Sequence, residues 1–262
     1  MPPRLSVNVN KVATVRNSRG GAVPSVIEAV QVCVDAGAPG ITVHPRADQR
    51  HITRGDVYEV ARLLAPLRGT VEYNIEGDPQ PEWLEMVHDV KPDQATLVPV
   101  VPGEITSQAG WTEKVAAGAA VKLPQIIADL QRDGIRVSLF IDADPAVIPW
   151  AARLKPDRVE LYTEPFARAV ERGTSDGQAS FERFAEVAEL VVGHGMAINA
   201  GHDLDLQNLP IFRELPHLVE VSIGHALISR ALFVGLDRVV REYLAVLEGV
   251  ERGKSKAGPH EA

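Results

Sequence analysis

Eight short apolar runs, separated by segments with helical periodicity, constrain the fold of this 262-residue chain more than any other feature. Each run is bounded by turn-forming or polar residues, which is typical of β-strands. Several runs follow either a glycine at the end of a helical segment or a Lys-Pro-Asp turn, and this recurrence indicates a repeated unit. The predicted strands cover residues 5–10, 40–44, 70–76, 94–99, 136–142, 158–163, 197–201 and 220–225.

The segments between these runs carry helix signals. Ser25 with Glu28, and Thr53 with Asp56, form capping-box pairs ahead of apolar stripes at helical spacing. Apolar strands that alternate with helices indicate a parallel sheet covered on its outer face, and eight such units close into a barrel. We therefore predict a single-domain (β/α)8 TIM barrel over residues 1–250. A doubly wound sheet is the alternative, although no G-x-G-x-x-G follows the first strand.

Composition limits the possible binding partners and the cellular location of the protein. The formal net charge is −8, and the only short basic stretch lies in a polar tail at residues 251–262 that we predict to be disordered. We therefore expect no nucleic-acid partner. The single cysteine, Cys33, lies in an apolar helical stripe, which excludes a disulfide framework and fits a reducing cytoplasm. Since no long uncharged apolar stretch is present, we expect a cytoplasmic protein with no membrane partner.

Ionisable side chains are concentrated where the predicted strands end. In a (β/α)8 barrel the active site lies at the C-terminal ends of the strands. His44, Glu76 and His202 end or follow the second, third and seventh strands, so we expect their side chains to converge as proton donors and acceptors. A lone histidine after a strand is more often a capping or surface residue, but convergence from three strands favours catalysis.

Two segments are suited to binding phosphate. Arg16 and Arg19 lie in the sequence R-N-S-R-G-G, and we interpret this loop as a bidentate phosphate clasp in preference to solvated loop charges. Gly224 and His225 run directly into a helix predicted over residues 226–247, where glycine and the helix N-terminus would hold phosphate. An ordinary tight turn is the other interpretation of the Gly-His pair.

Two other chemistries stay open at this point. His44, Glu76 and His202 could ligate zinc, although no local metal-binding motif supports that interpretation. Lys11, at the end of the first predicted strand, could form a Schiff base with a carbonyl substrate, or it could simply neutralise a phosphate.

Five stretches together resemble one enzyme family. They are V-N-V-N-K-V-A-T-V-R-N-S-R-G-G from Val7, G-I-T-V-H-P-R-A-D-Q-R-H-I from Gly40, V-S-L-F-I-D-A-D from Val137, I-N-A-G-H from Ile198 and S-I-G-H-A-L-I-S-R-A from Ser222. These ordered motifs, spread over nearly the whole chain, are similar to the pyridoxine 5′-phosphate synthase family. The resemblance implies a condensation of 1-deoxy-D-xylulose 5-phosphate with 3-amino-2-oxopropyl phosphate, which gives pyridoxine 5′-phosphate, inorganic phosphate and water. It also implies that the reaction needs no cofactor or metal and that the barrels assemble as homo-octamers.

The resemblance further implies roles for individual residues. His44 and Glu76 match the family's two proton acceptors, and His202 matches its proton donor. Contacts to the two phosphorylated substrates are implied for Asn8, Asn10, Lys11, Arg19, Arg46, His51, Thr106, Asp203, Gly224 and His225.

The sequence departs from the family's pattern at two of these places. Asn10 and Lys11 stand where many members have Asp-His, and Asp203 stands where many have glycine after the N-A-G-H histidine. We expect the change at Asn10 and Lys11 to alter substrate affinity or to mark a subgroup, and the change at Asp203 to require another phosphate donor or a shifted turn. Two rival functions follow: another phosphosugar enzyme, such as an aldolase or epimerase, or a non-catalytic barrel that binds phosphorylated metabolites. We also predict that residues 101–119 form a lid.

Overall fold

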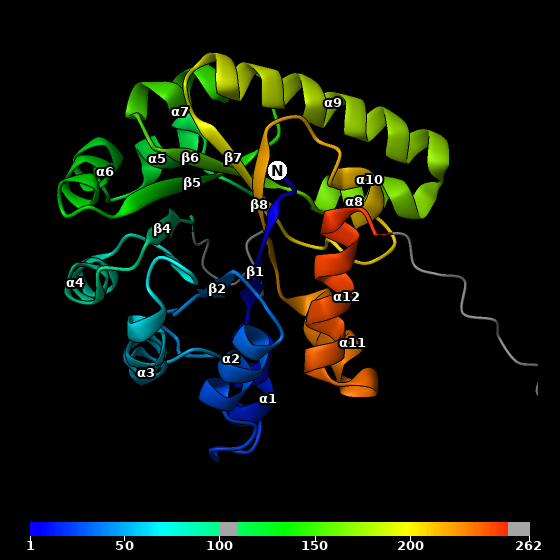
Figure 1. Ribbon diagram of the computed structural model, residues 1–262. Helices are drawn as coiled ribbons and strands as arrows, with labels where there is room; N and C mark the ends of the chain where they lie inside the picture. The colour runs from blue at the N-terminus through cyan, green and yellow to red at the C-terminus, as the bar shows by residue number, and fades with distance from the viewer. Residues whose placement is uncertain (100–108, 251–262) are drawn as a thin grey trace, which may run out of the picture.

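The eight predicted strands exist, and they form a closed parallel barrel in chain order (Figure 1). The structure is a computed structural model that describes residues 1–99 and 109–250. It confirms the (β/α)8 TIM-barrel prediction and not the doubly wound sheet. The strands are β1 (Arg4–Asn8), β2 (Gly40–Val43), β3 (Glu72–Gly77), β4 (Gln94–Leu97), β5 (Arg136–Asp142), β6 (Arg158–Tyr162), β7 (Ala197–Gly201) and β8 (Leu218–Ile223).

Helices surround the barrel, and several strand-to-strand connections contain two of them (Figure 1). The longest, α9, lies along the outside of the barrel and packs against α8. The helices are α1 (Asn10–Asn17), α2 (Val26–Asp35), α3 (Arg54–Leu64), the 3-10 turn η1 (Ala65–Leu67), α4 (Pro81–Val90), α5 (Glu113–Gly118), α6 (Leu123–Arg132), α7 (Ile148–Leu154), α8 (Glu164–Arg172), α9 (Thr174–Gly193), α10 (Leu209–Phe212), α11 (His225–Val234) and α12 (Leu236–Glu248).

The capping residues begin helices where the sequence predicts. The Thr53 hydroxyl accepts from the Asp56 amide while the Asp56 carboxylate accepts from the Thr53 amide, so α3 starts in a complete capping box. The Ser25 hydroxyl accepts from the Glu28 amide at the start of α2. The prediction of one helix over residues 226–247 is wrong, because Gly235 has φ +89° and divides it into α11 and α12.

The first strand is shorter than predicted. It ends at Asn8, and Asn10 is already the first residue of α1. Asn10 and Lys11 therefore lie on the first turn of a helix and not at the end of a strand. The predicted bounds of β5 and β7 agree with the structure.

Side chains alternate between two environments along each strand. Outward side chains such as Val7, Ile41 and Leu139 are apolar and completely buried against the surrounding helices. The predicted apolar runs are thus only half apolar, because the inward side chains are mostly polar. At mid-height the barrel is lined by Ser6, Thr42, Asn74, Thr96, Ser138, Glu160, Asn199 and Ser222, all of them buried.

Hydrogen bonds connect part of this polar lining across neighbouring strands. The Ser6 and Thr42 hydroxyls are 2.6 Å apart, the Asn74 amide donates to Thr42 at 3.2 Å, and Thr96 donates to the Asn74 carbonyl at 3.0 Å. These bonds satisfy groups that would otherwise be costly to bury.

The N-terminal end of the barrel contains a buried ionic network, which we call the basal cluster and which consists of Arg4, Glu72, Gln94, Arg136, Arg158 and Glu220. Arg158 lies 3.7 Å from a Glu72 oxygen and 3.6 Å from a Glu220 oxygen. Arg4 donates to Glu72 at 3.0 Å, and Arg136 is also paired with Glu72. The Gln94 carbonyl accepts from both Arg136 and Arg158. Both carboxylates of the basal cluster therefore have an arginine partner.

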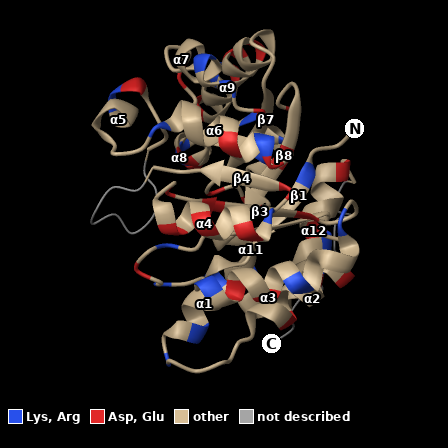
Figure 2. Cartoon of the chain, turned by 90° about the vertical axis from the view of Figure 1, so that its left-hand side faces the viewer, with Lys and Arg blue, Asp and Glu red and all other residues tan. Residues whose placement is uncertain are grey.

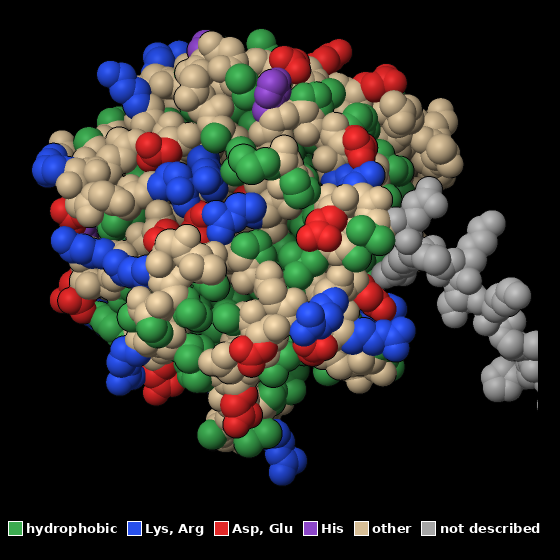
Figure 3. Space-filling model, viewed as in Figure 1, with side chains coloured by type: hydrophobic (Ala, Val, Ile, Leu, Met, Phe, Trp, Pro, Cys, Tyr) green, Lys and Arg blue, Asp and Glu red, His purple; other side chains and the backbone are tan. Residues whose placement is uncertain are grey.

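Acidic and basic residues are intermixed along the helices and loops (Figure 2). Figure 3 shows the same mixture on one face of the space-filling view. None of the helices in the described part of the chain is both long and apolar enough to cross a membrane.

Candidate active site

At the C-terminal end of the barrel, which we call the mouth, side chains from the first three strands meet. The Glu76 carboxyl lies at the centre of this group. One of its oxygens accepts from the Asn8 amide at 3.3 Å and lies 3.7 Å from Nδ1 of His44, and the other accepts from the Ser222 hydroxyl at 3.2 Å. The structure thus brings His44 and Glu76 together, as the sequence predicts.

Asn10 fixes the backbone beside this group. Its side-chain carbonyl accepts from the His44 amide at 2.8 Å, and its own amide donates to the Asn8 side chain at 3.1 Å. Asn10 therefore holds α1 against the end of β2, and its carbonyl oxygen is already used in positioning His44.

His44 is buried and neutral. Burial lowers the pKa of its imidazole to about 3, and the nearby His51, Arg46 and His202 add to the shift. Its Nε2 is buried and has no hydrogen-bond partner among the described residues. A neutral imidazole with a free ring nitrogen is suited to accept a proton from a substrate.

Two buried carboxyls lie below His44. Burial raises the pKa of Glu76 to about 8, the hydrogen bond from Ser222 opposes the shift, and the charge of Glu220 adds to it. Burial also raises the pKa of Glu160 well above its ordinary value, helped by Glu76 and Glu220. Burial thus favours the protonated form of both carboxyls, and Glu76, with a pKa of about 8, can both accept and return a proton.

His202 lies on the other side of the mouth, against aromatic rings. The centroid of its ring is 5.1 Å from that of Phe140 and 5.3 Å from that of Tyr162. The Thr163 hydroxyl contacts the carbonyls of both Gly201 and His202, which fixes the backbone here. Burial lowers the pKa of His202, whereas Asp203, Glu164 and the Gly201 carbonyl raise it and Lys11 lowers it.

The turn after β7 keeps a conformation that favours glycine. His202 has φ +82° and Asp203 has φ +57°, both in the left-handed region. The Asn208 amide donates to the Asp203 carbonyl at 3.0 Å and helps to hold this turn. Asp203 thus adopts the left-handed conformation with its side chain exposed, and the expectation of another donor or a shifted turn stays a prediction.

Three predicted substrate contacts lie beside these groups. The ring centroids of His51 and His44 are 6.0 Å apart. Burial, together with the charges of Lys11 and Arg46, lowers the pKa of His51 to about 4. Arg46 lies 3.8 Å from Asp48. This side of the mouth is suited to an anionic substrate group.

Glycines make space on the β7 and β8 side of the mouth. A Cβ at Gly201 would lie 2.5 Å from a Glu160 oxygen, and one at Gly224 would lie 3.1 Å from Asn8 atoms. Gly224 immediately precedes α11, so backbone amides at the start of that helix are available to a phosphate. His225 is exposed and lines an adjacent hollow with Asp205 and Ser229.

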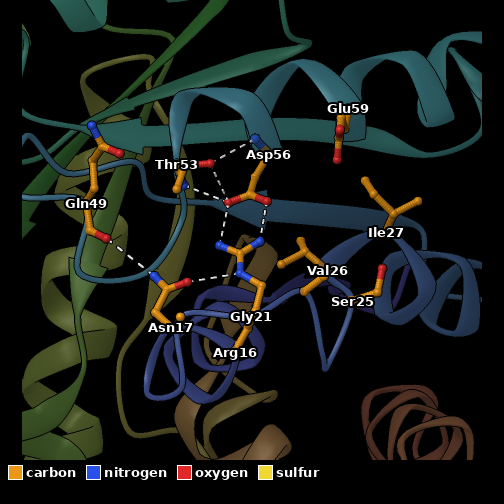
Figure 4. Close-up of a pocket in the computed structure, with 12 residues that line it drawn as sticks. Arg16, Asn17, Gly21, Ser25, Val26, Ile27, Gln49, Thr53, Asp56 and Glu59 are labelled. Carbon is orange, nitrogen blue, oxygen red and sulfur yellow. Dashed lines mark hydrogen bonds and ion pairs between the residues drawn. The ribbon is translucent and has the colours of Figure 1, made fainter.

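Arg16 does not serve as the predicted phosphate clasp. Figure 4 shows its guanidinium turned to the Asp56 carboxylate, with one contact at 2.8 Å in a bidentate pair. Asp56 caps α3 at the same time, so the pair joins α1 to α3. Arg19 is exposed just beyond α1, and no contact among the described residues connects it to His44, Glu76 or His202.

Two predictions fall on undescribed residues. Thr106 and residues 101–108 of the predicted lid lie outside the described part of the chain, whereas the rest of the predicted lid contains α5. Within residues 1–99 and 109–250, no group of three or more His, Cys, Asp or Glu side chains is arranged to hold a metal ion.

Sequence reasoning gave no role to Glu160 or to the pair formed by Tyr162 and Glu164. Alternation along β6 places Glu160 and Tyr162 on the inner face of the barrel. This alternation is the sequence signal that could have identified them as residues near the site. The pairing of β6 with β7 brings Tyr162 to His202, and the barrel brings Glu160 near Glu76.

Comparison with known proteins points to one family. Residues 5–249 match the model of the pyridoxal phosphate biosynthesis protein PdxJ. The chain is 46% identical to a pyridoxine 5′-phosphate synthase of Leptospira biflexa, over 93% of this chain and 96% of the relative. It is 49% identical to one of Bacteroides fragilis, over 92% of this chain and 97% of the relative.

Solved structures with the same fold have unrelated sequences. A thiamine phosphate pyrophosphorylase from Pyrococcus furiosus has a TM-score of 0.61 at 12% identity, covering 94% of this chain and 96% of that one. A phosphoribosyl anthranilate isomerase from Thermus thermophilus has a TM-score of 0.57 at 14% identity, covering 95% and 100%. These similarities support the barrel fold alone.

Proposed function

The chain belongs to the PdxJ family of pyridoxine 5′-phosphate synthases, and we propose that His44, Glu76 and His202 perform the proton transfers of that synthesis. The enzyme condenses 1-deoxy-D-xylulose 5-phosphate with 3-amino-2-oxopropyl phosphate. The products are pyridoxine 5′-phosphate, inorganic phosphate and water. Imine formation, loss of phosphate and ring closure each move a proton at a different atom, so several acid and base groups are needed around one pocket.

The observation that supports these roles best is the meeting of His44 and Glu76, with Nδ1 and Oε2 3.7 Å apart at the mouth. His44, being neutral, acts as the first proton acceptor through its free Nε2. Glu76, with a pKa of about 8, takes a proton in one step and returns it in another. His202 donates a proton from the opposite side. Glu160, whose protonated form burial favours, donates a hydrogen bond to negative charge that develops on the intermediate.

The two substrate phosphates require two separate binding regions. Lys11, Arg46 and His51 receive the phosphate of deoxyxylulose, and Asn10 and Thr106 complete that region. The amino-ketone phosphate lies at the glycine side of the mouth, on Gly224, His225 and the backbone of Asp203, with Asn8 and Arg19 as further contacts. Lys11 is here a phosphate-neutralising charge and not a Schiff-base nucleophile.

Assembly, location and cofactor use complete the proposal. The protein acts in the cytoplasm, without nucleic acid, membrane, metal or cofactor, and as a homo-octamer. Leu232 and Phe233, exposed by 71% and 87% at the end of α11, support an interface between subunits. Analytical ultracentrifugation should give a mass eight times the 28.3 kDa of the chain. A monomer at micromolar concentration would contradict the assembly.

The reaction is tested by mixing the protein with both substrates in the presence of a chelator, while the pyridine chromophore and released phosphate are followed together. Equal amounts of both products support the proposal and an activity independent of dissociable metal. Product formation that the chelator abolishes would contradict the metal-free reaction. Borohydride trapping of a substrate on Lys11 would favour an aldolase, and substrate binding without turnover would favour a non-catalytic barrel.

A further inference from the structure

Tyr162 and Glu164 form a pair at the edge of the mouth that the proposed chemistry does not use. The Tyr162 hydroxyl donates to a Glu164 oxygen at 2.7 Å. The other Glu164 oxygen accepts from Arg168 at 3.3 Å, one turn further along α8. The carboxylate is therefore held from two sides, and it is about one-third exposed.

The same tyrosine packs against His202. Its ring meets the imidazole nearly edge to face, with an interplanar angle of 78°, while Phe140 contacts the imidazole at 49°. Tyr162 thus connects the Glu164 carboxylate to His202 through a buried ring. Phe140, Tyr162 and Val98 form a small apolar cluster of their own on this side of the mouth.

We propose that Tyr162 and Glu164 are positioning residues that hold the His202 ring in place and stabilise its protonated form. The inference rests on the proposed role of His202 as a proton donor. A donor must carry its proton before it meets the substrate, yet burial in an apolar setting favours the neutral ring. A fixed carboxylate beside the ring opposes that effect of burial.

The charged and titratable groups that face His202 come from several elements. Glu164 from α8 and Asp203 from the same turn favour the imidazolium, whereas Lys11 from α1 opposes it. The charge of His202 also lowers the pKa of His44, which directly follows β2. Of the two carboxylates, Asp203 is exposed, while Glu164 is anchored by hydrogen bonds, so Glu164 supplies the charge with the more fixed position.

The test compares Glu164→Gln with Glu171→Gln. Both substitutions remove one negative charge from α8 and one contact of Arg168, but Glu171 is not among the groups that act on His202. The His202 signal in nitrogen-15 NMR spectra of histidine-labelled protein is assigned by its loss in His202→Asn. Glu164→Gln should lower the pKa of His202 by about 0.5–1 unit. Glu171→Gln should leave that pKa at the wild-type value.

Activity supplies the second measurement. The fall of kcat/KM at high pH reports an acid of the free enzyme. In Glu164→Gln this fall should occur at lower pH than in the wild type, whereas in Glu164→Asp it should occur at the wild-type pH again. Tyr162→Phe, which keeps the ring but frees the carboxylate, should give an intermediate shift. An unchanged His202 titration in Glu164→Gln would overturn the inference even if His202→Asn is inactive. Full activity of His202→Asn would instead remove the proposed donor and the inference with it.

Discussion

Both ends of the barrel bury carboxyl groups, but the two ends differ in whether arginine side chains lie against those groups. In the basal cluster Glu72 and Glu220 lie against arginines, and those cations oppose the effect of burial on the pKa of Glu220. At the mouth no cation opposes the rise in the pKa of Glu76 or Glu160. The arginines at the base offset part of the cost of burying carboxylates and contribute to structure, whereas Glu76 at the mouth has no such partner and, with a pKa of about 8, can hold a proton that is later transferred.

The largest effect that tests this contrast is on turnover. His44→Asn should lower kcat by about 10³-fold or more, because it removes the neutral imidazole that accepts the proton. Steady-state assays measure the loss, and circular dichroism checks that the barrel is intact. A folded variant with near-normal kcat would remove His44 from its assigned role.

Glu76→Gln should abolish turnover and yet stabilise the fold at alkaline pH. The pKa of Glu76 is raised from 4.5 to about 8, so its contribution to stability is complete below about pH 4.5 and is lost as the pH rises through 8. The loss approaches about 1.4 kcal/mol per pH unit, so the variant should exceed the wild type by roughly 4 kcal/mol at about pH 9. Urea unfolding at acid and alkaline pH measures the difference. Equal pH dependence in the two proteins would contradict the assigned shift.

Arg158→Met should have the opposite effect on stability. It removes a positive charge that is paired with the buried carboxylates of Glu72 and Glu220. The free energy of unfolding should therefore fall by about 3–5 kcal/mol. The remaining folded enzyme should keep its kcat, because the basal cluster lies at the far end of the barrel. Combining the change with Glu220→Gln should recover part of the loss. If the single variant is as stable as the wild type, pairing at the base contributes little.

The smallest effect is expected for an ion pair on the surface. Arg241 and Asp237 lie 2.9 Å apart on α12 and both are exposed. Arg241→Gln should leave the free energy of unfolding nearly unchanged, because solvent and salt screen the pair. Urea unfolding measures this change. A loss as large as that of Arg158→Met would show that burial is not what distinguishes the basal cluster.

Local sequence signals predicted the elements and the convergence of His44 and Glu76, because strand ends and helix caps depend on neighbouring residues. The basal cluster depends instead on barrel closure: Arg158 and Gln94 are 64 residues apart. Arg16 shows the same limit, since its guanidinium suits phosphate and carboxylate equally, and its partner Asp56 lies 40 residues away. The kind of group that a side chain can bind was thus predictable from the sequence, whereas the residue that it contacts in the folded chain was not.

The hydrogen-bonded lining at mid-height also bears on the order of folding. Bringing Ser6, Thr42 and Asn74 together buries little apolar area, whereas placing Val7 or Ile41 against the helices buries a great deal. Hydrophobic collapse therefore favours the docking of helices on individual strands. It contributes little free energy to the closure of the barrel. We therefore expect the pairing of β1 with β8, which joins the first strand to the last, to be a late step in refolding.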